Sequence, residues 1–137
     1  MAKEFSLRGR NFEEVKGMTV EELARVLPSR ERRTLKRGLS ENHKKLLEKI
    51  RKHPEKFHKT HLRNMIILPE MVGKKFGVYK GGAAEGDKSS KWVTVDVTPH
   101  MVGFRLGDFA IPTKRVQHSA PGIGASKSTK HASMRTT

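Results

Sequence analysis

The sequence predicts an α+β fold, with N-terminal helices followed by a small, mainly antiparallel β-sheet and a basic extended C-terminal tail. Two changes of pattern predict this order. Apolar residues first recur at intervals of three and four, as on one face of a helix, and later alternate with polar residues, as in a half-buried strand. The last residues show no periodicity. We therefore expect a basic helical region (1–64), a β-sheet core (65–112) and a basic tail (113–137).

Three helices are expected in the first region. Residues 19–22, Thr-Val-Glu-Glu, form a capping box that begins the first helix, and Pro28 ends it. Ser29 is the expected cap of a second helix, SRERRTLKRG, which Gly38 closes. Ser40 begins a third, amphipathic helix. The residues expected on its buried face are His43, Leu46, Leu47 and Ile50.

Short apolar segments predict the strands of the core. Residues 55–64 form a polar connector, after which Met65–Leu68 and Phe76–Tyr79 are buried-strand candidates. Residues 92–97 alternate strictly, so that their three valines face one way. The Gly- and Ser-rich segment 81–90 is expected to be the hairpin loop between the last two strands.

Two similar phrases stand 30 residues apart, PEMVG from Pro69 and PHMVG from Pro99. Proline suits the first position of a helical turn and glycine the left-handed position that ends one. Each phrase therefore predicts a single helical turn, rigid enough to present its N–H groups and nearby cations to phosphate. The alternative is that the two phrases are simply tight turns of the fold, without a ligand. The expected turn residues are Pro69, Met71, Gly73, Pro99, Met101, Gly103 and Gly107.

Charge is high and unevenly placed. The chain has 29 Lys and Arg against 14 Asp and Glu, a formal charge of +15. By segment the charge is +2 over 1–33, +7 over 34–65, +1 over 66–112 and +5 over 113–137. A polyanion would relieve the self-repulsion of such a body and release counterions on binding. We expect a nearly neutral folded centre with basic flanks that bind phosphates; the alternative is a basic surface without a partner.

The tail, TKRVQHSAPGIGASKSTKHASMRTT, is basic and has no acidic residue. A segment of this composition cannot bury enough apolar surface to fold alone. We interpret it as an extension that orders when it runs along RNA, the alternative being a tail without function.

No enzyme, metal or cofactor is predicted. The absence of cysteine excludes disulfides and thiolate chemistry. His53, His58 and His61 lack a spacing that would direct three imidazoles at one ion, and the GIG at 122–124 lacks the remaining features of a dinucleotide site. The longest apolar run, at 65–68, is too short to cross a bilayer. We expect a cytoplasmic protein without a membrane partner.

Two ordered phrases carry a family resemblance. THLRNMIILPEMVGKKFGVYKG (60–81) followed by TPHMVGFRLGDFAIPTK (98–114) resembles the universal small-subunit ribosomal protein S-nineteen family. The N-terminal SRERRTLKRGLSENHKKLLEKIRK and the tail's PGIGAS (121–126) are similar to its archaeal and eukaryotic branch, whose eukaryotic member is called S-fifteen. The similarity extends from Phe5 to Lys127.

The resemblance implies a structural protein in the head of the small ribosomal subunit, bound to small-subunit ribosomal RNA. It also implies a neighbour, ribosomal protein S-thirteen, and a tail near the decoding region and the subunit interface, where tRNA or the large subunit would be its contacts. Charge alone leaves one alternative open, a DNA-compacting chromatin protein.

The RNA-binding residues expected are cationic side chains on the second helix, beside the turns and at the start of the tail. Arginine suits this task because its planar fork grips one phosphate with two bonds. The alternative for the helix is a solvated face. The expected residues are Arg30, Arg32, Arg33, Lys36, Arg37, His61, Arg63, Lys74, Lys75, Arg105, Lys114, Arg115, His118 and Lys127.

Overall fold

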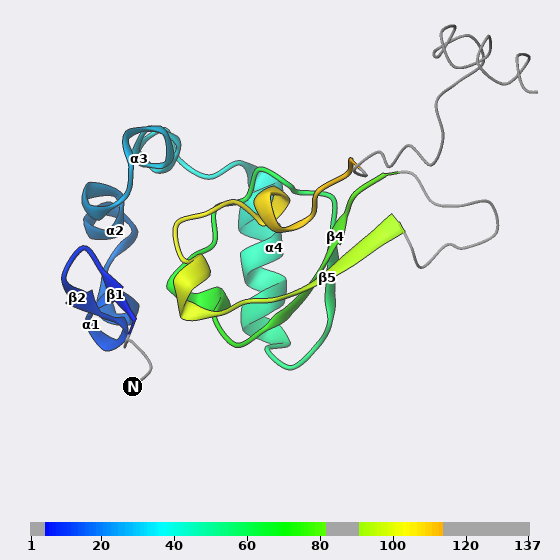
Figure 1. The fold of residues 1–137 in the computed structure, drawn as a ribbon, viewed down its shortest axis with the longest axis horizontal. Coiled ribbons are helices and arrows are strands. Elements are labelled where there is room, and N and C mark those ends of the chain that lie inside the picture. The colour runs from blue at the N-terminus through cyan, green and yellow to red at the C-terminus, as the bar shows by residue number, and fades with distance from the viewer. Residues whose placement is uncertain (1–4, 82–90, 114–137) are drawn as a thin grey trace, which may run out of the picture.

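The computed structural model describes residues 5–81 and 91–113 and has the predicted α+β class (Figure 1). Among these residues, four helices and a short hairpin precede the main sheet, one 3-10 turn lies between its first two strands, and two more follow its last strand. The helices are α1 (Phe12–Gly17), α2 (Val20–Val26), α3 (Ser29–Lys36) and α4 (Glu41–Lys52). The strands are β1 (Ser6–Leu7), β2 (Arg10–Asn11), β3 (His58–Thr60), β4 (Lys75–Tyr79) and β5 (Trp92–Asp96). The turns are η1 (Pro69–Met71), η3 (Pro99–Met101) and η4 (Leu106–Phe109). None of the described helices is long and apolar enough to cross a membrane.

The main sheet has the order β3-β4-β5. β4 and β5 pair antiparallel, as do β1 and β2 in a separate hairpin, whereas β3 pairs with β4 in parallel. The strand β3 lies in the predicted polar connector, so that prediction was wrong. Its inward side chains, His58 and Thr60, are polar, which hides the alternation from a reading of apolar residues alone. Burial of the His58 ring is tolerated because its Nε2 makes a 3.0 Å hydrogen bond with the carbonyl of His53.

Residues 65–68 are buried as predicted but do not form a regular strand. They make one isolated bridge, between Ile66 and Arg105. Around it, the N–H of Ile67 donates to the carbonyl of Phe104 at 2.8 Å, and the N–H of Leu106 donates to the carbonyl of Met65 at 3.0 Å. The apolar run therefore passes through the core bound to the segment after the second turn.

The helix boundaries follow their capping residues. The N–H of Glu22 donates to Thr19 Oγ1 and the N–H of Thr19 donates to Glu22 Oε2, which is the predicted capping box. Ser40 Oγ accepts from the N–H of His43 at 3.4 Å. Ser29 differs from the prediction: it is the first residue of α3, and Pro28 occupies the cap.

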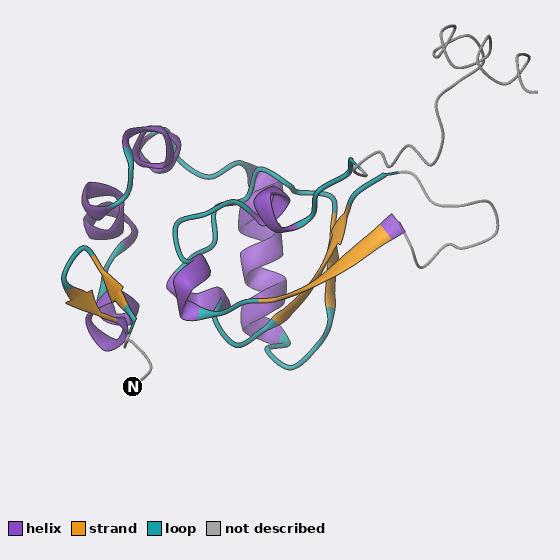
Figure 2. Cartoon of the chain, viewed as in Figure 1, coloured by secondary structure: helices purple, strands orange, loops and turns teal. Residues whose placement is uncertain are grey.

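One hydrophobic core joins the helices to the sheet. The inward face of α4 packs with Phe76, Val78 and Val95 of the sheet, while α2 contributes Leu23 and Leu27 to the same cluster. Figure 1 shows α1 to α3 beside the body formed by α4, β4 and β5, and Figure 2 shows how short the helices of that flank are. The flank meets the body at Gly103, where an added Cβ would lie 2.4 Å from Leu27 Cδ2.

Candidate nucleic-acid interface

Helix α3 carries the densest group of cations, and Leu35 is its buried residue. Five cationic side chains from α3 and its C-cap were predicted to bind RNA. Arg32 is half-buried. The other four are exposed: Arg30, Arg33, Lys36 and Arg37. The helix has one acidic side chain, that of Glu31, and it faces the body. The outward surface of α3 therefore offers positive charge without a competing carboxylate of its own.

An ion pair fastens α3 to the body. Arg105 Nε lies 3.7 Å from Glu31 Oε1, and the two side chains are 24% and 17% exposed. Asp108 accepts from the N–H of Arg105 at 2.9 Å, which fixes the backbone of that arginine. Arg105 was predicted to bind RNA; its place in the structure makes it the anchor of the cationic helix.

Arg63 makes a second internal connection. Its Nη1 donates to the carbonyl of Tyr79 at 2.8 Å, and its Nη2 donates to those of Gly107 and Ala110 at 3.2 and 2.7 Å. Three carbonyls from two segments thus share one guanidinium. The predicted RNA contact of Arg63 stays a prediction, and the bonds in the structure give this residue a structural task.

The two Met-Val-Gly turns have the expected local form. Pro69 and Pro99 stand at the first turn of 3-10 helices, and Gly73 and Gly103 have φ angles of 80° and 89°, which favour glycine. Gly107 has another reason to lack a side chain, because an added Cβ would lie 2.9 Å from the carbonyl oxygen of Arg63.

Several N–H groups of the two turns already donate within the fold, and the predicted contact of the turns with phosphate stays a prediction. In the first turn the N–H of Val72 donates to Pro69 and that of Gly73 to Val97. In the second turn the N–H of Val102 donates to Pro99 and that of Gly103 to Ile67. The turns therefore serve as corners of the fold.

The lysines beside the first turn differ in their surroundings. Glu70 accepts two 2.9 Å hydrogen bonds from Arg51 of α4, and this bonding holds the pKa of Glu70 below its usual value. Burial lowers the pKa of the neighbouring Lys74. Lys75 is exposed and lies 3.9 Å from Asp96, a distance at which an exposed pair is weak. Lys75 is thus more accessible to a phosphate than Lys74.

His61 belongs to an aromatic cluster that the sequence analysis missed. Its ring centroid lies 4.4 Å from that of Tyr79 and 4.9 Å from that of Trp92. Lys59 Nζ lies 5.8 Å from the centroid of Trp92. Lys59 and His61 alternate with buried Thr60, which places them on one face, but this alternation does not show which rings from other strands they meet. The predicted tail residues Lys114, Arg115, His118 and Lys127 lie outside the described residues.

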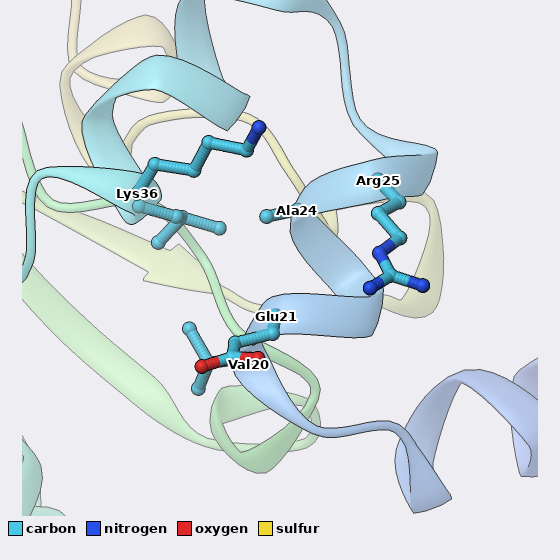
Figure 3. Close-up of a pocket in the computed structure, with 6 residues that line it drawn as sticks. Val20, Glu21, Ala24, Arg25 and Lys36 are labelled. Atoms are coloured by element: carbon cyan, nitrogen blue, oxygen red, sulfur yellow. The ribbon is translucent and has the colours of Figure 1, made fainter.

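A hollow separates α2 from α3 (Figure 3). It has a volume of about 280 Å³ and is lined by Val20, Glu21, Ala24, Arg25, Leu35 and Lys36. Figure 3 shows these side chains coming from both helices. Its charged groups have both signs. Within residues 5–81 and 91–113, no group of three or more His, Asp or Glu side chains is placed to hold a metal ion.

Fold and charge together define a class, the small basic α+β proteins whose surface suits a polyanion. Comparison with known proteins gives the family. Residues 33–118 match the family described as Ribosomal protein S19. The chain is also 41% identical to the small ribosomal subunit protein uS19 of Saccharolobus solfataricus over 138 aligned residues, covering 97% of this chain and 93% of that relative. The chain belongs to the ribosomal protein S19 family.

Proposed function

We propose that the chain is a structural constituent of the small ribosomal subunit and binds its ribosomal RNA in the cytoplasm. The observation that carries this proposal is the match to a small-subunit protein over nearly the whole chain. The +15 charge and the exposed cations of α3 support it independently. The family match gives no support to the DNA-compacting alternative. The chain is thus assigned to a family of structural ribosomal proteins rather than of enzymes.

The finer placement follows from the same resemblance. We propose that the chain lies in the head of the subunit, beside protein S-thirteen, with residues 113–137 directed toward the decoding region. In this arrangement α3 faces RNA with Arg30, Arg33, Lys36 and Arg37, while Arg105 and Arg63 hold the surface in place. The division of the chain into regions at residues 64 and 112 stays a proposal. Across the first boundary, α4 packs on the main sheet and β3 is one of its strands.

Sedimentation of a lysate tests the proposal. The chain should travel with small subunits, leave them after ribonuclease treatment or at high salt, and stay with them after deoxyribonuclease treatment. Salt sensitivity is expected because each phosphate contact acts mainly through counterion release. Release by deoxyribonuclease alone would contradict the ribosomal assignment.

A further inference from the structure

The outward face of the main sheet carries an unusual set of side chains. The register pairs Tyr79 with Trp92 and Lys59 with Gly77, so these residues share one face. Phe76, Val78 and Val95 point to the other face and are buried in the core. Figure 1 shows β5 crossing in front of α4, whose apolar side chains belong to the same core as Phe76, Val78 and Val95. We call the opposite side the outer sheet face; its residues are Phe57, Lys59, His61, Gly77, Tyr79, Trp92 and Thr94, with the paired Lys75 and Asp96 at its far end.

Aromatic rings cover much of this face. His61, Tyr79 and Trp92 form a closed group, in which Tyr79 and Trp92 lie 5.2 Å apart at an interplanar angle of 64°. Phe57 lies over Gly77, where an added Cβ would be 2.7 Å from the ring carbon Cζ. Phe57 is nevertheless 42% exposed, and His61 is exposed too. Tyr79 and Trp92 are half-buried, and the part of a packed ring that stays open is a rigid surface on which a further flat group can stack.

A groove beside these rings supplies the charge. It runs between α4 and β3 and has a volume of about 420 Å³. Lys45 and Lys49 line it from α4, and Lys59 and His61 line it from β3 and the residue after it. All the described residues that line it are apolar, polar or basic, and none is acidic. Lys59 links the groove to the aromatic group, because its Nζ also lies over the Trp92 ring.

We propose that the outer sheet face and the groove between α4 and β3 bind single-stranded RNA, with an unpaired base stacked on the rings of Trp92 and His61. The phosphates beside that base lie in the groove near Lys45, Lys49 and Lys59. Sequence-tolerant binding of single strands uses this combination, since every base has a flat face and every nucleotide a charge. The inference rests on the proposed function and adds a second RNA contact, built from elements other than α3.

Fluorescence of the full chain tests the stacking directly, because Trp92 is the single tryptophan. A short single-stranded oligoadenylate should quench the emission in a saturable way, whereas duplex RNA of equal length should quench it far less. Anisotropy of a labelled strand reports binding in the same titration. Binding of the single strand without quenching would overturn the inference.

Substitutions locate the site. Trp92→Leu should weaken binding of the oligoadenylate by roughly 5- to 150-fold, the range expected for one lost base stack, while Trp92→Phe should retain most of the affinity. Phe104→Ala is the matched control, since Phe104 is exposed directly after the turn of residues 99–103 and lies outside the face. Circular dichroism checks each fold, and His61→Ala replaces Trp92→Leu if that variant unfolds. Equal affinity of a folded variant and the original chain would contradict the proposal.

An experiment on intact small subunits distinguishes failure of this inference from failure of the proposed function. Ultraviolet irradiation should crosslink RNA to peptides containing His61 or Trp92. Crosslinking of this face to another protein, in subunits that retain the chain, would overturn the inference and leave the proposed function intact. Failure of the unmodified chain to sediment with small subunits would overturn the proposed function itself.

Discussion

Helices α3 and α4 both carry many cations, but they are held in the molecule in different ways. Helix α4 buries four side chains along one face, those of His43, Leu46, Leu47 and Ile50. Helix α3 buries Leu35 and relies in addition on the Glu31–Arg105 pair. The cations of α4 therefore project from a helix that the core stabilises, whereas those of α3 stand on a helix with one buried side chain, which packs beside α2.

This difference separates a scaffold from a binding element. Like charges at neighbouring positions of a helix repel one another, and few apolar contacts in α3 offset that repulsion. Phosphates would supply the missing stabilisation on binding. We therefore expect α3 to gain order from RNA and α4 to be ordered without it.

The largest expected effect comes from truncating the anchor of α4. Ile50 is fully buried, and Ile50→Ala should lower the free energy of unfolding by about 2–5 kcal/mol. Leu35→Ala should cost less, at most about 2 kcal/mol, because Leu35 lines a surface hollow into which its neighbours can relax. Urea denaturation measures both. A greater cost for Leu35→Ala would reverse the comparison.

Next in size is the loss of Arg63. Arg63→Gln would leave at least some of its three carbonyl partners without a donor, at a cost of roughly 1–3 kcal/mol. Arg33→Gln, at an exposed position of α3, is the matched control and should change stability by less than about 0.5 kcal/mol. For RNA affinity we expect the opposite order, with a greater loss for Arg33→Gln than for Arg63→Gln. If Arg33→Gln left both stability and affinity unchanged, α3 would not be the binding surface we assign.

A smaller effect is expected at the ion pair. Glu31→Gln should cost about 1 kcal/mol or less, and the loss should appear as faster amide exchange in α3 with little change in α4. Glu48→Gln, on the exposed side of α4, controls for the change of charge. Uniform acceleration across both helices would mean that the pair supports the whole fold rather than α3.

The smallest effect is a pH dependence at Glu70. Arg51 lowers the pKa of Glu70 from 4.5, so the carboxylate stabilises the folded chain above its unfolded pKa. That contribution is lost as the pH falls through the lowered folded value. Glu70→Gln should therefore reduce Tm at neutral pH and leave it unchanged at the acidic end of a melting series. A constant difference across the series would contradict this cause.

The sequence predicted what depends on apolar spacing and caps. The capping box at Thr19, the buried face of α4 and the two proline-led turns all follow from local chemistry. It did not predict β3, because polar His58 and Thr60 occupy the inward positions. The strand predicted at residues 65–68 is a single isolated bridge, and its partner segment is about 40 residues away in the sequence. Nor could it find the aromatic group, whose members come from three separate segments.

Among the candidate site residues, the sequence identified cations but could not sort them by task. Arg105 and Arg33 look alike in the sequence, yet one faces Glu31 and the other faces solvent. That distinction depends on tertiary contacts between α3 and the second turn. Charge counting therefore located the basic flank, and the fold separated its anchors from its exposed groups.

Amide hydrogen exchange on the isolated chain and on intact small subunits tests the central claim most directly. The account predicts fast exchange in α3 and slow exchange in α4 for the isolated chain, with α3 becoming protected in the subunit and α4 changing little. Equally slow exchange of both helices in the isolated chain, or unprotected α3 amides in the subunit, would contradict it.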